Sequence, residues 1–399
     1  MDIKRTQAWK TAEWDYGAIQ ADLKMAPFGL TLAPEVVADR LRRIVRRCPQ
    51  FYPAVIELAL RQLATKGDVR SERMLEKGFR LMIELASPKN FGIGIEGLVE
   101  NLENLWRFDL SRRLLQLLAD RRRLNATLHD SLSYAAARLG DLAAAQSHIG
   151  DALRLEPRSK SFWSNKGLYH LMGGELNEAA IALRKARELG PKDPVVIGNL
   201  EICKYLEKHG GDYFAYLLRP LDRKQIDRYA DQEKWDRVDD MCADFNGCRM
   251  EAFAQSTFLK AGKARLRLPS LLSTLRTFFR FVAQIDPSGT FIHEDMNRVH
   301  ENFKPIMHKF IFKFGDVDRE TMDDVFEGLE AYYGFLASRK LVADTDFNLF
   351  RKRVSALKGD LIGKMDRYNA IRHDASIKED QKEELREELF EGDHAWPHF

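Results

Sequence analysis

Residues 126–159 read ATLHDSLSYAAARLGDLAAAQSHIGDALRLEPRS, and residues 160–193, which follow directly, read KSFWSNKGLYHLMGGELNEAAIALRKARELGPKD. The two segments share small and apolar residues at a constant spacing of 34 positions. The matched pairs are Gly140 and Gly174, Ala145 and Ala179, Ile149 and Leu183, Ala152 and Ala186, and Pro157 and Pro191. A fixed period of this length indicates a stacked array, because a single unit of this size cannot bury its apolar face alone.

The second segment resembles the tetratricopeptide repeat, a helix–turn–helix unit. Its residues at the signature places of that family are Trp163, Gly167, Gly174, Ala179, Leu183, Ala186 and Pro191. The first segment departs from the pattern, with His129, Ser133 and Ala136 where Trp, Gly and Tyr are usual. The resemblance implies an all-α, right-handed superhelix (an α-solenoid) that binds proteins and has no enzymatic activity.

The repeat pattern weakens on both sides of these two segments. Residues 51–124 read as two diverged hairpins, and residues 194–208 as a fifth first helix that ends at paired glycines, so repeats are expected over 51–211. Residues 1–50 form a separate N-terminal helical region. A helix is predicted there from Pro34, because apolar residues recur at helical spacing; these residues are Val37, Leu41, Ile44 and Cys48.

The repeat period is lost beyond about residue 212, although helical patterns continue. We expect a C-terminal helical domain over 212–375, with helices at 223–246, 248–262, 268–285, 291–314, 318–338 and 344–367. Residues 376–399 are predicted to form an acidic helix and tail, with a helix over 376–391. An acidic helix of this kind suits docking onto a basic surface, so its deletion is expected to change partner binding more than folding.

The composition is that of a globular protein. Hydrophobic residues make up 45% of the 399 residues, charged residues 31%, and the net charge is +3, which argues against global disorder and is too small to indicate nucleic-acid binding by itself. The four scattered cysteines indicate buried thiols, not a disulfide framework. The N-terminus lacks the apolar core of a signal peptide, and no apolar run is long enough to cross a bilayer. We therefore expect a cytoplasmic protein that does not bind membranes.

The resemblance also implies a binding surface, because first helices line the concave groove of such arrays. Asn165 and Asn199 are separated by one repeat period, and in the family asparagines stacked at this place hold the main chain of a bound segment. The other expected groove residues are Tyr134, Arg138, Leu168, Met172, Ile202 and Tyr205. An alternative stays open for the two asparagines, namely hydrogen bonding within the array. The expected partner is a protein or peptide, and the protein is expected to be an adaptor or scaffold.

Two arginine clusters offer a second interpretation. Arg40, Arg43 and Arg47 share one helical face, and Arg121, Arg122 and Arg123 are consecutive. Guanidinium groups suit contacts with phosphate or with an acidic partner. The alternative function is therefore a nucleic-acid-associated regulatory protein, and the alternative structural role is a solvated face paired with local acids. Binding to phosphate should weaken steeply with salt, whereas groove binding should not.

Two motifs with possible chemistry are set aside. Residues 92–97 match the dinucleotide fingerprint G-x-G-x-x-G, but an apparent helix precedes them instead of a strand, so they are interpreted as a flexible lead-in to a helix. His293 and His300 are separated by two helical turns, which on a helix places both on one face, but a metal site needs a third ligand. We expect no catalytic residues, no metal and no cofactor.

Overall fold

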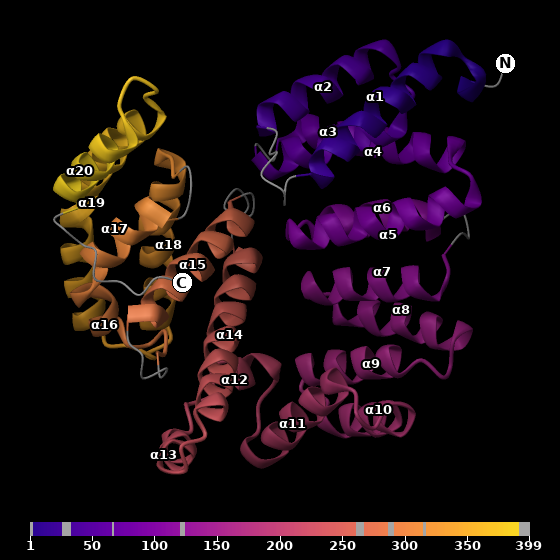
Figure 1. Ribbon diagram of the computed structural model, residues 1–399. Coiled ribbons are helices and arrows are strands. Elements are labelled where there is room, and N and C mark those ends of the chain that lie inside the picture. Colours follow the sequence, from indigo (N-terminus) through magenta and orange to yellow (C-terminus); the bar gives the residue numbers. More distant parts are fainter. Residues whose placement is uncertain are drawn as a thin grey trace. The chain divides into compact units, whose positions relative to one another are not determined.

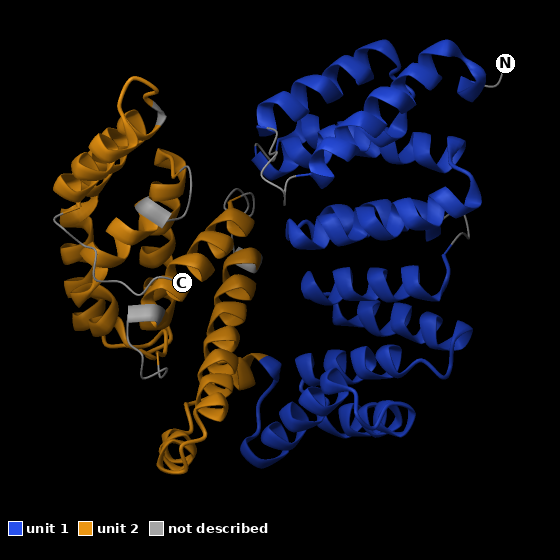
Figure 2. Cartoon of the chain, viewed as in Figure 1, with its two compact units in different colours: residues 1–213 blue, residues 214–399 orange. Residues whose placement is uncertain are grey.

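The computed structural model describes residues 3–25, 33–65, 68–119, 124–260, 267–285, 291–313 and 317–390. These residues form helices and no strands, which confirms the all-α prediction (Figure 1). Two compact units divide the chain, residues 1–213 and residues 214–399 (Figure 2). No helix in the described part of the chain has the length and apolar character needed to span a membrane.

Unit 1 is a series of helices that pair along the chain. Its helices are α1 (Gln7–Lys24), α2 (Pro34–Arg47), α3 (Tyr52–Thr65), α4 (Val69–Leu85), α5 (Pro88–Asn104), α6 (Phe108–Ala119), α7 (Ala126–Arg138), α8 (Leu142–Leu155), α9 (Lys160–Met172), α10 (Leu176–Leu189) and α11 (Pro194–His209), after a short 3-10 helix at Ile3–Arg5. The hairpins α7–α8 and α9–α10 are the two clear repeats, and neighbouring helices pack against one another along the array. The predicted α-solenoid is therefore present.

Side-chain caps fix where the repeat helices begin. The side chain of Asn125 accepts a hydrogen bond from the Leu128 amide before α7, and that of Asp141 accepts one from the Ala144 amide before α8. Ser159 does the same for the Phe162 amide before α9. Each cap satisfies an amide that a helix leaves unpaired in its first turn.

Glycines permit the tight geometry of the clear repeats. Gly140 and Gly174 occupy the turns of the two hairpins with φ angles of 82° and 73°, a region that residues with a Cβ rarely adopt. At Gly167 an added Cβ would lie 2.5 Å from Leu183 Cγ, so only glycine lets α9 approach α10 this closely. The residues that reveal the repeat in the sequence are thus those that set its packing.

The N-terminal part of unit 1 confirms one predicted helix and adds another. Helix α2 begins at Pro34, and its residues Val37, Leu41 and Ile44 are buried with Cys48, as the spacing predicts. Helix α1 is an addition that the sequence pattern does not predict. It packs through Trp9, whose ring lies 5.0 Å from that of Phe51 in an edge-on arrangement.

Unit 2 contains α13 (Arg223–Asp231), α14 (Trp235–Lys260), α15 (Leu268–Ile285), α16 (Met296–Glu301), α17 (Phe303–Lys313), α18 (Arg319–Ser338), α19 (Asp344–His373) and α20 (Glu379–Leu389); α12 (Tyr213–Leu217) begins at the last residue of unit 1. The predicted helix boundary near residue 247 is wrong, because α14 continues through Gly247. The chain turns earlier, at Glu233, which has a φ of 55°.

The predicted helix over 291–314 is also wrong, because its first residues are not helical. The side chain of Asn246 on α14 holds them instead: its Nδ2 donates to the Phe291 carbonyl at 2.9 Å, and its Oδ1 accepts from the His293 amide at 2.8 Å. These bonds to the main chain compete with helix formation. The inference that His293 and His300 share a helical face is therefore wrong as well, since α16 begins only at Met296.

The acidic C-terminal helix is anchored to unit 2 by apolar residues. Leu389 and Phe390 are buried, and the Phe390 ring lies 5.2 Å from that of His308 and 5.6 Å from that of Tyr368. Because of this packing, deletion of the segment should also destabilise unit 2; whether it changes partner binding more than folding stays a prediction. Residues 391–399 lie outside the described residues.

Candidate interaction groove of the repeats

The first helices of the repeats form one face of unit 1. Contacts join α7 to α9 and α9 to α11, in addition to the contacts within each hairpin. Tyr134, Leu168 and Ile202 occupy equivalent places on α7, α9 and α11, because one repeat period separates each from the next. All three side chains are partly exposed, as are those of Met172 and Tyr205. We call Tyr134, Leu168 and Ile202 the apolar ladder.

The two asparagines of the predicted site make hydrogen bonds between successive first helices. Asn165 Nδ2 donates to Asp130 Oδ1 at 2.9 Å, and Asn199 Nδ2 donates to Ser164 Oγ at 3.0 Å. Asn165 is partly exposed, whereas Asn199 is only 7% exposed. This arrangement matches the alternative that the sequence left open, in which the amides join neighbouring helices of the array.

Arg138, the predicted groove cation, lies over three aromatic rings. Its guanidinium carbon is 4.5 Å from the centre of the Trp106 ring, 5.2 Å from that of Phe108 and 5.9 Å from that of Tyr134. Trp106 lies between α5 and α6 with a φ of 54°. Cation–π attraction holds the arginine in place. The sequence pattern placed Arg138 and Tyr134 here, but it gave no sign that Trp106 and Phe108 would join them.

The carboxyl group of Glu103 lies close enough to Arg138 to sense its charge, and Asp130 lies near Glu103. Desolvation raises the pKa of Glu103 to about 7, and the neighbouring Asp130 and Glu100 add to this while Arg138 opposes it. Desolvation also raises the pKa of Asp130, against the hydrogen bond from Asn165. The sequence did not reveal Glu103, because it belongs to a hairpin that lacks the repeat signature. The predicted groove residues Tyr134 and Arg138 are thus accompanied by a partly buried acidic pair, Glu103 and Asp130.

The arginines of α2 are engaged mainly with acids of unit 1. Arg40 pairs with Asp22 at 2.6 Å, and Arg47 with Asp15 at 3.4 Å, so both tie α2 to α1. Arg43 is exposed. The second predicted cluster, Arg121, Arg122 and Arg123, lies outside the described residues. The pairing of Arg40 and Arg47 fits a helix-packing role.

The glycines at 92–97 lie inside α5, so their interpretation as a flexible lead-in is wrong. The helix begins at Pro88, where the Ser87 side chain caps it. Gly94 and Gly97 line a mostly apolar cavity of about 330 Å³ with residues of α1 and α3, including Tyr16 and Ile56. The described residues contain no strand to build the βαβ unit that a dinucleotide site of this type needs.

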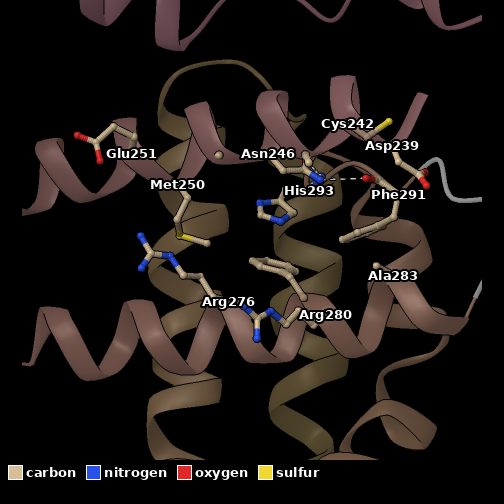
Figure 3. Close-up of a pocket in the computed structure, with 13 residues that line it drawn as sticks. Asp239, Cys242, Asn246, Met250, Glu251, Arg276, Arg280, Ala283, Phe291 and His293 are labelled. Atoms are coloured by element: carbon tan, nitrogen blue, oxygen red, sulfur yellow. Dashed lines mark hydrogen bonds between the residues drawn. The ribbon is translucent and has the colours of Figure 1, made fainter. Parts of the chain in front are cut away.

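His293, a candidate metal ligand in the sequence, lies at a cavity of about 500 Å³ in unit 2 (Figure 3). Its ring stacks on Phe279 at 3.9 Å, and its Nδ1 lies 2.9 Å from the Tyr332 hydroxyl. Burial lowers the pKa of His293 to about 3. The imidazole is therefore neutral and hydrogen-bonded at physiological pH, as expected for a packing role. His300 contacts Arg353 instead.

The comparisons with known proteins support the fold of the repeats. No curated protein matches the sequence. A family model described as the tetratricopeptide repeat matches residues 131–194, which covers most of the hairpins α7–α8 and α9–α10. Residues 131–194 are thus similar to tetratricopeptide repeats, which generally mediate protein–protein interaction.

Proposed function

We propose that this protein is a non-enzymatic adaptor or scaffold that binds a segment of a partner protein along α7, α9 and α11. The observation that carries the proposal is the apolar ladder. Tyr134, Leu168 and Ile202 are partly exposed at the same place in three successive helices, although neighbouring apolar residues such as Leu171 and Leu206 are buried. A row of accessible apolar side chains at a constant spacing suits a partner that lies across the helices.

Polar and charged groups beside the ladder could orient a bound segment. The Nδ2 group of Asn165 is bonded to Asp130, but the carbonyl oxygen of the same side chain can accept a hydrogen bond from the main chain of the partner. Asn199 is buried and bonded to Ser164, so we assign it to holding α11 against α9. Arg138 places a positive charge over the ring of Tyr134, and Glu103 is an acidic group near Arg138.

Site-specific photo-crosslinking tests this function. A photoreactive phenylalanine derivative replaces Leu168 in the ladder or, as a control, Ile181 on α10, which is 61% exposed and belongs to a second helix. We expect cross-links to a distinct partner from position 168 and none to that partner from position 181. Equal cross-linking from both positions, or none from position 168, would contradict groove binding.

Charge introduction then measures the energy of the contact with the purified partner. Leu168→Glu and Ile202→Glu each place a carboxylate on the ladder and should weaken binding by about fivefold or more, since loss of a central contact residue costs more than about 1 kcal/mol. Ile181→Glu should leave binding unchanged.

The salt dependence distinguishes the alternative function. Nucleic-acid binding through the arginines would weaken steeply between low and moderate salt and would be insensitive to changes in the ladder. Groove binding should instead persist at the higher salt concentration. A steep salt response together with unaltered binding by Leu168→Glu would therefore contradict the proposal.

A further inference from the structure

Three potential metal ligands come together in the hairpin α7–α8. His129 lies on α7, and His148 and Asp151 lie on α8, where a spacing of three residues puts them on one face. One ligand atom from each residue lies within 4.8 Å of the other two. The distance between His129 Nδ1 and Asp151 Oδ2 is 3.7 Å, too long for a hydrogen bond.

Both histidines carry a buried nitrogen that no described residue satisfies. The Nδ1 atoms of His129 and His148 are each shielded from solvent and lack a hydrogen-bond partner among the residues of known placement. A buried polar atom without a partner costs free energy and calls for an explanation such as a bound ion. Burial also lowers the pKa of both imidazoles, which favours the neutral form that coordinates metals.

The repeat fold does not require these residues. The second repeat has Trp163, Ala182 and Lys185 at the places of His129, His148 and Asp151, and it forms the same hairpin without a cluster. The cluster is therefore an addition to one repeat. His129 and His148 are well separated in the sequence, so only the hairpin brings the three ligands together.

We propose that His129, His148 and Asp151 bind a divalent transition-metal ion of the zinc type. Zinc lies about 2.0–2.2 Å from imidazole nitrogens and carboxylate oxygens, so tetrahedral ligands are about 3.4 Å apart. The ligand atoms of the three side chains lie within 4.8 Å of one another, so each separation exceeds this spacing by about 1.4 Å at most. Two imidazoles and one carboxylate favour zinc over Mg²⁺, which prefers oxygen ligands.

The residues around the three ligands orient Asp151 and leave space beside the proposed metal. The Oδ1 atom of Asp151 pairs with Arg154, while its Oδ2 atom faces His129. Arg154 thus holds one oxygen of the carboxylate and leaves the other oxygen for the metal. A cavity of about 350 Å³ adjoins the cluster and is lined by Ala119, Leu124, Arg154 and Leu155 besides the ligands His129 and Asp151. Three protein ligands and an adjoining cavity leave a fourth coordination position for water or for a ligand from another molecule.

Metal titration of the full chain tests the site. The purified protein is treated with a chelator, dialysed and titrated with Zn²⁺ by calorimetry, and Co²⁺ is used to report tetrahedral coordination by its visible absorption. His148→Ala introduces the residue found at this place in the second repeat, so the hairpin should still fold. His209→Ala, at an exposed histidine of α11, is the matched control.

We expect the wild type and His209→Ala to bind one equivalent of Zn²⁺, and His148→Ala to bind it more than about 100-fold more weakly. Loss of a residue that only supports a ligand costs about 10–100-fold, and a ligand should cost more. Zn²⁺ should raise the melting temperature of the wild type and not that of His148→Ala.

Two results would overturn the site: no Zn²⁺ binding by the wild type above that of His148→Ala, or equal and tight binding by both. If circular dichroism shows that His148→Ala is unfolded, Asp151→Lys takes its place, because Lys185 occupies the equivalent position in the second repeat. The same two outcomes then decide the question.

Discussion

Glu103 is an acidic residue whose surroundings penalise its charge. Its carboxyl group is desolvated in the groove, and Asp130 lies close enough to disfavour ionisation further, so its pKa is raised from 4.5 to about 7. Arg138 lowers the pKa of Glu103, but by less than desolvation and the two neighbouring carboxylates raise it. The groove therefore gains negative charge across the physiological pH range.

Removing this carboxyl should make stability less dependent on pH. Because the pKa of Glu103 is higher in the folded than in the unfolded state, its contribution to stability is present below pH 4.5 and is lost as the pH rises through 7. Glu103→Gln should therefore be more stable than the wild type at pH 8, by about 1 kcal/mol after allowance for solvent screening. At pH 5 the free energies of unfolding of Glu103→Gln and the wild type should differ less.

Urea denaturation followed by circular dichroism at both pH values gives this comparison. Glu96→Gln, at an exposed residue about two turns earlier on α5, is the control and should not show the gain at pH 8. An equal difference between Glu103→Gln and the wild type at both pH values would argue against a raised pKa.

Among the elements, α20 shows how a strongly charged helix can still belong to a core. It carries Glu383, Glu384, Glu387 and Glu388, while the residues at its end, Leu389 and Phe390, are buried. Phe390 contacts the rings of His308 and Tyr368, from α17 and α19. The helix is held by these two residues at its C-terminal end.

Truncation of the Phe390 side chain should destabilise unit 2. Phe390→Ala should lower the free energy of unfolding by about 3 kcal/mol, through lost burial and the cavity left behind. The control Glu383→Ala, on the exposed surface, should change it by less than about 0.5 kcal/mol. Chemical denaturation measures the free energy of unfolding of both variants. A change for Phe390→Ala as small as that for Glu383→Ala would mean that the end of α20 does not pack as described.

The contrast between α1 and α2 shows what sequence periodicity can predict. In α2 the buried residues Val37, Leu41 and Ile44 lie on one helical face and the arginines on the other, so the pattern was clear. In α1 the buried Trp9 is followed by Trp14, which is 81% exposed. Large apolar residues point both inward and outward there, so periodicity could not identify the helix.

The candidate groove was predictable to the same extent as the repeats that form it. The register of the repeat predicts Tyr134, Leu168 and Ile202 as groove residues at equivalent positions, and all three are partly exposed. The register does not predict the contact of Arg138 with Trp106, because Trp106 belongs to the hairpin α5–α6, which lacks the signature residues. The hydrogen bonds of Asn165 and Asn199 also depend on which side chain of the preceding first helix lies nearest. The sequence of a single repeat does not determine this.

At the scale of the whole molecule, unit 1 contains complete hydrophobic cores. One cluster joins α1, α2 and α3, another extends from α3 to α7, and a third fills the hairpin α7–α8 and the start of the next. All three lie within residues 1–213. Because contacts in a repeat array are mainly between neighbours, the array does not depend on distant parts of the chain.

A fragment of residues 1–213 should therefore fold alone. We expect cooperative thermal unfolding, a helical circular dichroism spectrum and binding to the same partner as the full chain. A shorter fragment, residues 1–193, lacks α11, which covers α9 and α10, and should melt at a lower temperature. A fragment 1–213 that aggregates or lacks helical structure would show that unit 2 is needed for folding.

The hydrogen bonds of Asn165 and Asn199 have a consequence for the growth of the array by gene duplication. Each joint between first helices pairs a donor with an acceptor 35 residues earlier. Suppose that residues 160–193 were duplicated in tandem. The copy of Asn165 would then lie 35 residues after the original Ser164 and could donate to it. Asn199 would lie 35 residues after the copy of Ser164 and could donate to that serine. Both bonds would be preserved at every junction. The array can thus lengthen by whole repeats while the same type of hydrogen bond joins each new pair of first helices.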